Sequence, residues 1–121
     1  MKSYDVVVIG AGPAGIFTAL ELYKHASPEM RVLIVDEGIS IYNRKCPART
    51  NGTCVRCNPC NIMSGWAGAG AFSDGKLSLS EEVGGNITNY LPLDKVRELI
   101  KYADDMYICL LYTSDAADDR I

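Results

Sequence analysis

A short apolar run that ends in a glycine-rich turn constrains the fold of this chain more than any other feature. Residues 5–9 read Asp-Val-Val-Val-Ile without alternation of polar and apolar side chains, which is typical of a parallel strand buried on both faces. An apolar stretch with helical spacing then runs from the turn to about His25, and a second β-branched run covers residues 31–36. This order predicts a right-handed βαβ unit in an α/β fold with a Rossmann-like parallel sheet.

The turn itself has the spacing G-x-G-x-x-G, with glycines at positions 10, 12 and 15. We expect the first glycine to allow a tight turn, the second to let backbone N–H groups approach a pyrophosphate, and the third to let helix and strand pack closely. The helix N-terminus adds partial positive charge and free N–H donors. The alternative is a glycine-rich turn that binds nothing. We predict a dinucleotide site that comprises Gly10, Ala11, Gly12, Pro13, Ala14 and Gly15.

An acidic residue follows the second predicted strand at the position where dinucleotide-binding folds hold a ribose. Asp36 lies 21 positions after Gly15 and is expected to accept hydrogen bonds from the adenosine ribose hydroxyls. A carboxylate in this place disfavours a 2′-phosphate. Glu37 is the second candidate for the same contact.

Four cysteines lie in a segment without periodicity that follows the βαβ pattern. Their spacing is C-x7-C-x2-C-x2-C, formed by Cys46, Cys54, Cys57 and Cys60. This spacing is compatible with zinc, with an iron–sulfur cluster, with a dithiol that cycles to a disulfide, and with unligated thiols. The basic residues among them either favour thiolates or form a solvated basic loop. These are Arg44, Lys45, Arg49 and Arg56.

A second glycine-rich stretch covers residues 62–77, and its small residues would let the backbone lie flat against a planar ligand. For the aromatic side chains of Trp66 and Phe72, core packing and contact with a ligand ring are both open. After Pro92, apolar residues recur at helical spacing, and Asp94 is a candidate cap for that helix.

Composition excludes several classes of function. The net charge of −3 gives no reason to propose nucleic acid or an anionic membrane as partner. No apolar run is long enough for a membrane helix or a signal peptide, so we expect a cytoplasmic protein. Hydrolase and P-loop motifs are absent, and His25 reads as a solvated residue at a helix end.

Two motifs together resemble a known family. The pattern G-x-G-x-x-G-x-x-x-A over residues 10–19 resembles the FAD-binding N-terminus of two-dinucleotide-binding flavoproteins. With residues 44–75 added, the chain resembles bacterial FAD-dependent dehydrogenases of the NAD(P)/FAD-dependent oxidoreductase type. The resemblance implies FAD as cofactor, NAD(P)H as a candidate electron donor and a small-molecule substrate. It also implies that the flavin or its pyrophosphate lies near Gly68, Gly70, Phe72 and Ser73. For Asp74 and Lys76 two roles are open, because they either contact the reacting centre or simply pair with each other in a turn.

Two other functions stay open beside this interpretation. One is a cysteine-ligated metal or iron–sulfur electron-transfer module with a secondary nucleotide site, and the other is an NAD-binding Rossmann domain. On the flavoprotein interpretation, residues 1–108 are the N-terminal part of an incomplete FAD-binding domain, with a Cys-rich insertion at about residues 43–61. Residues 109–121 resemble a translated sequencing adapter and are expected to be a non-native tail. The fragment by itself is expected to be inactive.

Overall fold

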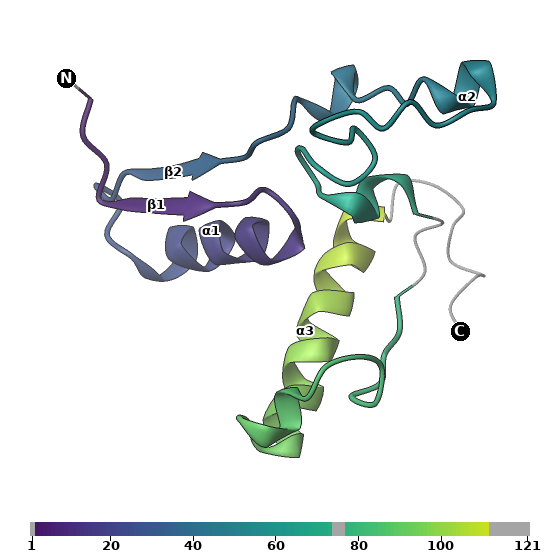
Figure 1. Ribbon diagram of the computed structural model, residues 1–121. Helices are drawn as coiled ribbons and strands as arrows, with labels where there is room; N and C mark the ends of the chain where they lie inside the picture. The colour runs from purple at the N-terminus through teal and green to yellow at the C-terminus, as the bar shows by residue number, and fades with distance from the viewer. Residues whose placement is uncertain (1, 74–76, 112–121) are drawn as a thin grey trace. The chain divides into compact units, whose positions relative to one another are not determined.

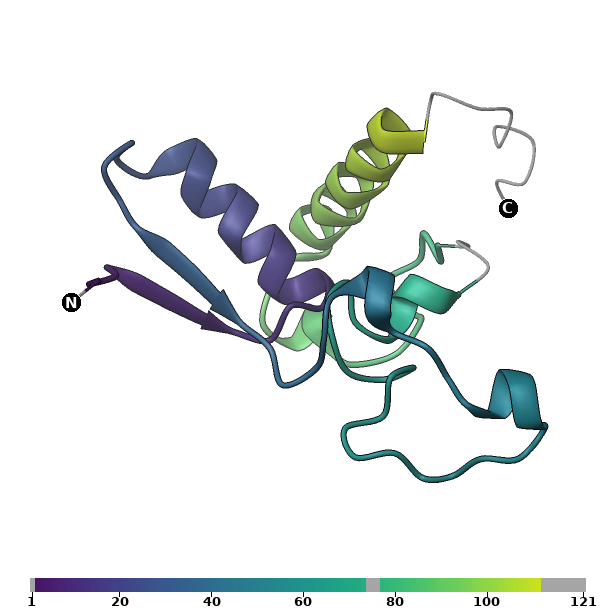
Figure 2. The same cartoon turned by 90° about the horizontal axis from the view of Figure 1, so that it is seen from above.

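Two short parallel strands and the helix that connects them form the framework of the N-terminal part, as the computed structural model shows (Figure 1). Strand β1 (Val6–Ile9) pairs with β2 (Val32–Val35) in register, from Val6 opposite Val32 to Ile9 opposite Val35. Helix α1 (Pro13–His25) packs against both strands. Figure 2 shows α1 running along one side of the pair. The predicted parallel βαβ unit and the α/β fold class are confirmed.

The structure describes residues 2–73 and 77–111, with side chains up to residue 108. The chain divides into two compact units after Ser73. Beyond the βαβ unit, the first unit contains the short elements η1 (Ile41–Asn43), α2 (Ala48–Asn51) and η2 (Ala69–Phe72). The second contains η3 (Ile87–Asn89) and α3 (Leu93–Leu111).

The strands are less buried than their sequence predicts. Along β1, half-buried and exposed residues alternate, with Val7 53% and Ile9 88% exposed. The expectation of a strand buried on both faces is therefore wrong for the described part of the chain. The physical reason is that α1 covers one face of the strand pair, and no described element of the first unit covers the other.

Helix α1 begins and ends as its sequence predicts. Pro13 stands in the first turn, where its missing N–H costs no hydrogen bond. Lys24 and His25 lie in the last turn, where positive charge is favoured by the helix dipole. His25 is 75% exposed and lies 3.3 Å from Glu21, which agrees with a solvated position at the helix end.

In the second unit, α3 presents the expected apolar stripe. Val96 is 2% exposed, and residues 100, 103 and 107 are half-buried, whereas Leu99 is 40% exposed and lies outside the buried stripe. The helix begins at Leu93, so Asp94 lies inside the first turn rather than at the cap. None of the helices that the structure describes is both long and apolar enough to span a bilayer.

Candidate dinucleotide site

The site begins where β1 ends, at a turn that Gly10 makes possible. Gly10 has a φ of +101°, a backbone conformation that side chains with a Cβ rarely adopt. Its N–H donates to the carbonyl oxygen of Val35 at 2.7 Å, which ties the turn to the end of β2. The predicted role of Gly10 in a tight turn agrees with this geometry.

Gly15 sits at the point of closest approach between α1 and the turn. A Cβ built on Gly15 would lie 1.9 Å from the carbonyl oxygen of Gly10 and 3.4 Å from Cγ1 of Val8. No L side chain fits in that space without a shift of the backbone. The absence of a side chain therefore lets α1 start directly above the end of β1.

Asp36 holds the turn from the side of β2. One carboxylate oxygen, Oδ2, accepts a hydrogen bond from the N–H of Ala11 at 2.8 Å, and Oδ1 accepts one from Gly38 at 2.8 Å. Ala11 is completely buried. The N–H of Ala11, followed by that of Gly38, lowers the pKa of Asp36 below its ordinary value of 3.8, and the positive charge of Arg44 lowers it further. The carboxylate is therefore charged at neutral pH and organises the turn.

The predicted ribose contact of Asp36 stays a prediction. A carboxylate offers about four lone-pair positions, so the two backbone bonds leave acceptor capacity for a ribose hydroxyl. The second candidate, Glu37, is exposed and accepts a hydrogen bond from Oγ of Ser64 at 2.5 Å.

The N-terminus of α1 is open to a ligand. Gly12 is the N-cap residue, no side chain caps the helix, and its first turn contains no acidic residue. Pro13 and Ala14 are exposed. Backbone N–H groups at an uncapped helix start need acceptors, and a phosphate is a suitable one. The turn therefore fits the pyrophosphate of a dinucleotide.

The second glycine-rich stretch lies directly against this turn. Ala67 donates its N–H to the carbonyl oxygen of Ala11 at 2.9 Å. A Cβ built on Gly68, whose φ is +66°, would lie 3.0 Å from Cα of Gly12. The structure thus brings Gly68, one of the predicted cofactor neighbours, into contact with the first glycine turn.

A buried arginine determines how this stretch is folded. Arg44 is 4% exposed and donates hydrogen bonds to four backbone carbonyl oxygens at 2.6–2.8 Å. The acceptors are Asn61, Ile62, Trp66 and Gly68. For Arg44, the alternative of a solvated basic loop is wrong, because the guanidinium satisfies carbonyl groups of a segment that has no regular secondary structure. Sequence reasoning missed this role, and no spacing pattern marks it.

The remaining predicted residues of this stretch surround η2. Phe72 is half-buried and lies close to two guanidinium groups, with Cζ of Arg44 4.8 Å and Cζ of Arg49 5.2 Å from its ring centroid. Gly70 is open, with no atom within 4 Å of a built Cβ, and its carbonyl oxygen accepts the N–H of Ser73. Trp66 is 43% exposed, so core packing does not account for it. Asp74 and Lys76 lie outside the described residues.

The four cysteines of the predicted metal site are free, and Cys54 is exposed. Among the described residues, no three Cys, His, Asp or Glu side chains are arranged to hold one metal ion. The spacing of Cys46, Cys54, Cys57 and Cys60 therefore does not produce a ligand cluster in this structure. N–H groups of Met63 and Ile62 lower the pKa of the Cys60 thiol, and the charge of Arg44 adds to this effect.

Comparison with known proteins agrees with this arrangement. Residues 4–102 match the model of a family described as pyridine nucleotide-disulphide oxidoreductase. The chain is also similar to an uncharacterized protein of Clostridium beijerinckii, with 38% identity over 73 residues, and the match covers 60% of this chain and 13% of that protein. No solved structure matches the chain.

Proposed function

Because this chain belongs to the pyridine nucleotide-disulphide oxidoreductase family, whose members typically bind FAD and NAD(P), we propose that its glycine turn holds the ADP moiety of FAD. The whole protein would then be a flavin-dependent dehydrogenase that acts on a small molecule, with NAD(P)H as a candidate electron donor. The flavin supplies the redox chemistry in such an enzyme, and the protein binds and orients it.

The observation that carries this proposal is the combination of a closely packed turn and an open helix start. Gly15 leaves no space between α1 and Gly10, while Gly12 and the exposed Ala14 leave the first turn of the helix accessible. Uncapped N–H groups and the helix dipole attract a pyrophosphate at this end of α1. On this proposal, Asp36 accepts a ribose hydroxyl beside its two backbone hydrogen bonds.

The contact between the two glycine-rich segments favours a ligand that extends past the turn. Gly68 touches Gly12, and η2 follows directly, with the open Gly70 and the half-buried Phe72. We assign this stretch to the flavin side of the cofactor. Its glycines allow a planar group to approach the backbone.

A pair of charge substitutions on α1 tests the pyrophosphate contact without removing a glycine. Ala14→Asp adds a negative charge to the first turn, where acidic residues stabilise a helix but repel phosphate. Thr18→Asp adds the same charge one turn further along, at another exposed position. Equilibrium titrations of the 121-residue chain with FAD, riboflavin and NAD+ give the dissociation constants.

We expect FAD to bind at least about tenfold more tightly than riboflavin, which lacks the ADP moiety, a difference of about 1.4 kcal/mol. Ala14→Asp should weaken FAD binding by a similar factor, and Thr18→Asp should change it much less. Equal binding of FAD and riboflavin would contradict the proposal. Binding of NAD+ without binding of FAD would mean that the glycine turn is an NAD site and not an FAD site.

A further inference from the structure

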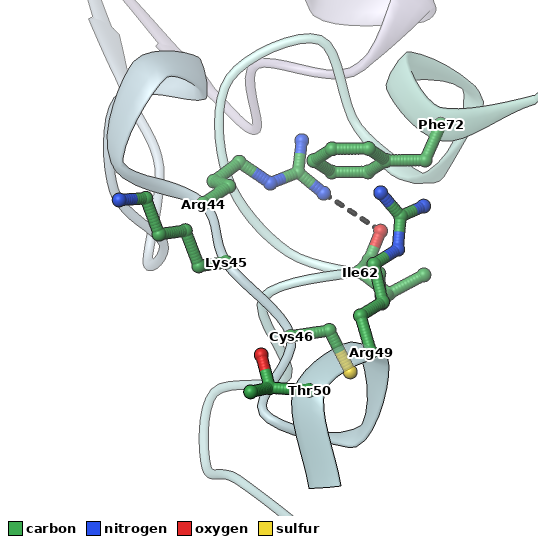
Figure 3. Close-up of a pocket in the computed structure, with 7 residues that line it drawn as sticks. All are labelled: Arg44, Lys45, Cys46, Arg49, Thr50, Ile62 and Phe72. Carbon is green, nitrogen blue, oxygen red and sulfur yellow. Dashed lines mark hydrogen bonds between the residues drawn. The ribbon is translucent and has the colours of Figure 1, made fainter. Parts of the chain in front are cut away.

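The lining of a small pocket in the first unit includes no residue of the helix start that we assign to the pyrophosphate. Its volume is about 200 Å³, which is below the range of about 300–1,000 Å³ found for most ligand sites. Arg44 and Arg49 line it together with Ile62 and Phe72 (Figure 3). A pocket of this volume is too small for a whole dinucleotide, so only a small molecule would fit.

The pocket carries positive charge without a described counter-ion. Besides the two arginines, Lys45 lines it, and the lining includes no acidic residue. In Figure 3 the amine of Lys45 points away from Arg49, so the guanidinium groups are the charges that face the ring of Phe72. Both Cζ atoms lie near this ring and therefore at most about 10 Å from each other, roughly the Debye length at 0.1 M salt. Two like charges this close favour an anion beside them.

The two arginines differ in what they still offer to a ligand. The guanidinium of Arg44 donates to four backbone carbonyls, so it contributes charge but few free donors. Arg49 is exposed, and among the described residues it contacts the ring of Phe72 without a carboxylate or carbonyl partner. An arginine fork matches the two oxygens of a carboxylate. Arg49 is therefore the group that would bind the anion.

The apolar residues of the lining limit the choice of anion. Ile62 and the ring of Phe72 are apolar, and a fully polar ion such as inorganic phosphate would leave them without a matching surface. A ligand with a carboxylate at one end and a hydrocarbon or aromatic body at the other would match both the charged and the apolar residues of the lining.

The geometry points to a binding site for a small organic acid, with its carboxylate on Arg49 and its apolar body against Ile62 and Phe72. The site does not depend on which nucleotide the glycine turn holds. Arg44 connects the two, because it lines the pocket and also donates to the carbonyl oxygen of Gly68. An acidic small molecule bound here would contact Phe72, which belongs to the segment that we assign to the flavin.

Isothermal titration of the 121-residue chain with benzoate tests this inference. Benzamide serves as the neutral ligand of the same shape, and inorganic phosphate serves as the anion without an apolar body. Arg49→Gln removes the proposed anion-binding group. Arg56→Gln removes the same charge from another exposed position of the loop that does not line the pocket. Circular dichroism establishes that each variant is folded, and Arg49→Lys tests whether charge alone is sufficient.

We expect benzoate to bind at least tenfold more tightly than benzamide or phosphate. Arg49→Gln should weaken benzoate binding at least tenfold, Arg56→Gln by less than twofold, and Arg49→Lys by an intermediate factor. Equal losses in the two Gln variants would reveal unspecific attraction to a basic loop and would overturn the site. Preference for phosphate, or no binding of benzoate to the folded chain, would overturn it as well.

Discussion

Gly15 has no side chain, and this allows the first turn of α1 to pack against the backbone of Gly10. We predict that Gly15→Ala lowers the free energy of unfolding by about 1–3 kcal/mol, because its Cβ would lie 1.9 Å from the carbonyl oxygen of Gly10 and the backbone must shift. Urea denaturation followed by circular dichroism measures the change. Gly70→Ala is the matched control for stability, since a Cβ built there meets no atom within 4 Å. An equal loss in both variants would contradict the packing argument.

The lowered pKa of the Asp36 carboxylate predicts that the stability of the chain depends on pH. Its pKa is below 3.8 in the folded chain, chiefly because of the N–H of Ala11 and then that of Gly38. The unfolded chain therefore binds more protons near this pH, so the stabilisation is complete above about pH 5 and is lost as the pH falls through 3.8 towards the folded value.

Asp36→Asn should accordingly destabilise the chain by about 1–3 kcal/mol at neutral pH, because one backbone N–H then faces an amide donor. The difference from the wild type should shrink on acidification below about pH 4. Urea denaturation at neutral and acid pH measures it, with Glu37→Gln as the control for loss of a neighbouring charge. A difference that is the same at both pH values would mean that the charge of Asp36 contributes nothing.

Residues with a fixed backbone task could be predicted from the sequence, whereas Arg44 could not. The spacing of Gly10 and Gly15 follows from the geometry of one turn and one helix, so local sequence contains the information. The four acceptors of Arg44 come from residues 61–68, 17 to 24 positions away, and become a cluster only when the loop has folded. Backbone carbonyls carry no sequence signature, and an arginine among cysteines is equally compatible with a solvated position.

At the scale of elements, the segment from Asn61 to Gly68 depends on one side chain. Arg44→Lys keeps the positive charge but offers three donors from a single atom, which cannot reach four carbonyls around a planar group. We predict that Arg44→Lys lowers the free energy of unfolding by about 2–4 kcal/mol, because buried carbonyl acceptors are left without donors. Trp66 reports on the same segment, because its carbonyl oxygen accepts a hydrogen bond from Nη1 of Arg44.

Denaturation followed by tryptophan fluorescence measures this effect. Arg31→Lys is the control, because Arg31 is 57% exposed and its contact with Asp5 is 3.7 Å long. An exposed ion pair of this kind contributes about 0–1 kcal/mol. If Arg44→Lys lowers the free energy of unfolding no more than Arg31→Lys does, then other contacts hold the segment from Asn61 to Gly68 in place.

Apolar periodicity predicts the strands and helices of the chain correctly. It gives no information about the segments that have no regular secondary structure. The expected strands and helix of the βαβ unit form at the predicted positions, and α3 carries its apolar stripe on Val96. The Cys-rich segment contains only the short helix α2 between irregular turns, and its thiols do not gather into a metal site among the described residues. Cysteine spacing alone does not determine where thiols point, because a loop without regular structure takes its shape from distant contacts.

For the whole molecule, the family match and the βαβ fold both support a dinucleotide-binding domain. The match to the pyridine nucleotide-disulphide oxidoreductase model covers residues 4–102 and so includes the βαβ unit, the Cys-rich segment and the second glycine-rich stretch. The similarity to the clostridial relative extends over 13% of that protein's length. The activity of a complete enzyme therefore stays a proposal, whereas nucleotide binding by this chain is directly testable.

The visible absorbance spectrum of the 121-residue chain, incubated with FAD and then desalted, shows directly whether the glycine turn binds FAD. The proposal predicts a two-band flavin spectrum that remains with the protein and bleaches on reduction. Chain treated with riboflavin, and the Ala14→Asp variant treated with FAD, should retain much less flavin after the same step. A colourless wild-type chain, or equal flavin retention by wild type and Ala14→Asp, would contradict the assignment of the glycine turn to the pyrophosphate of FAD.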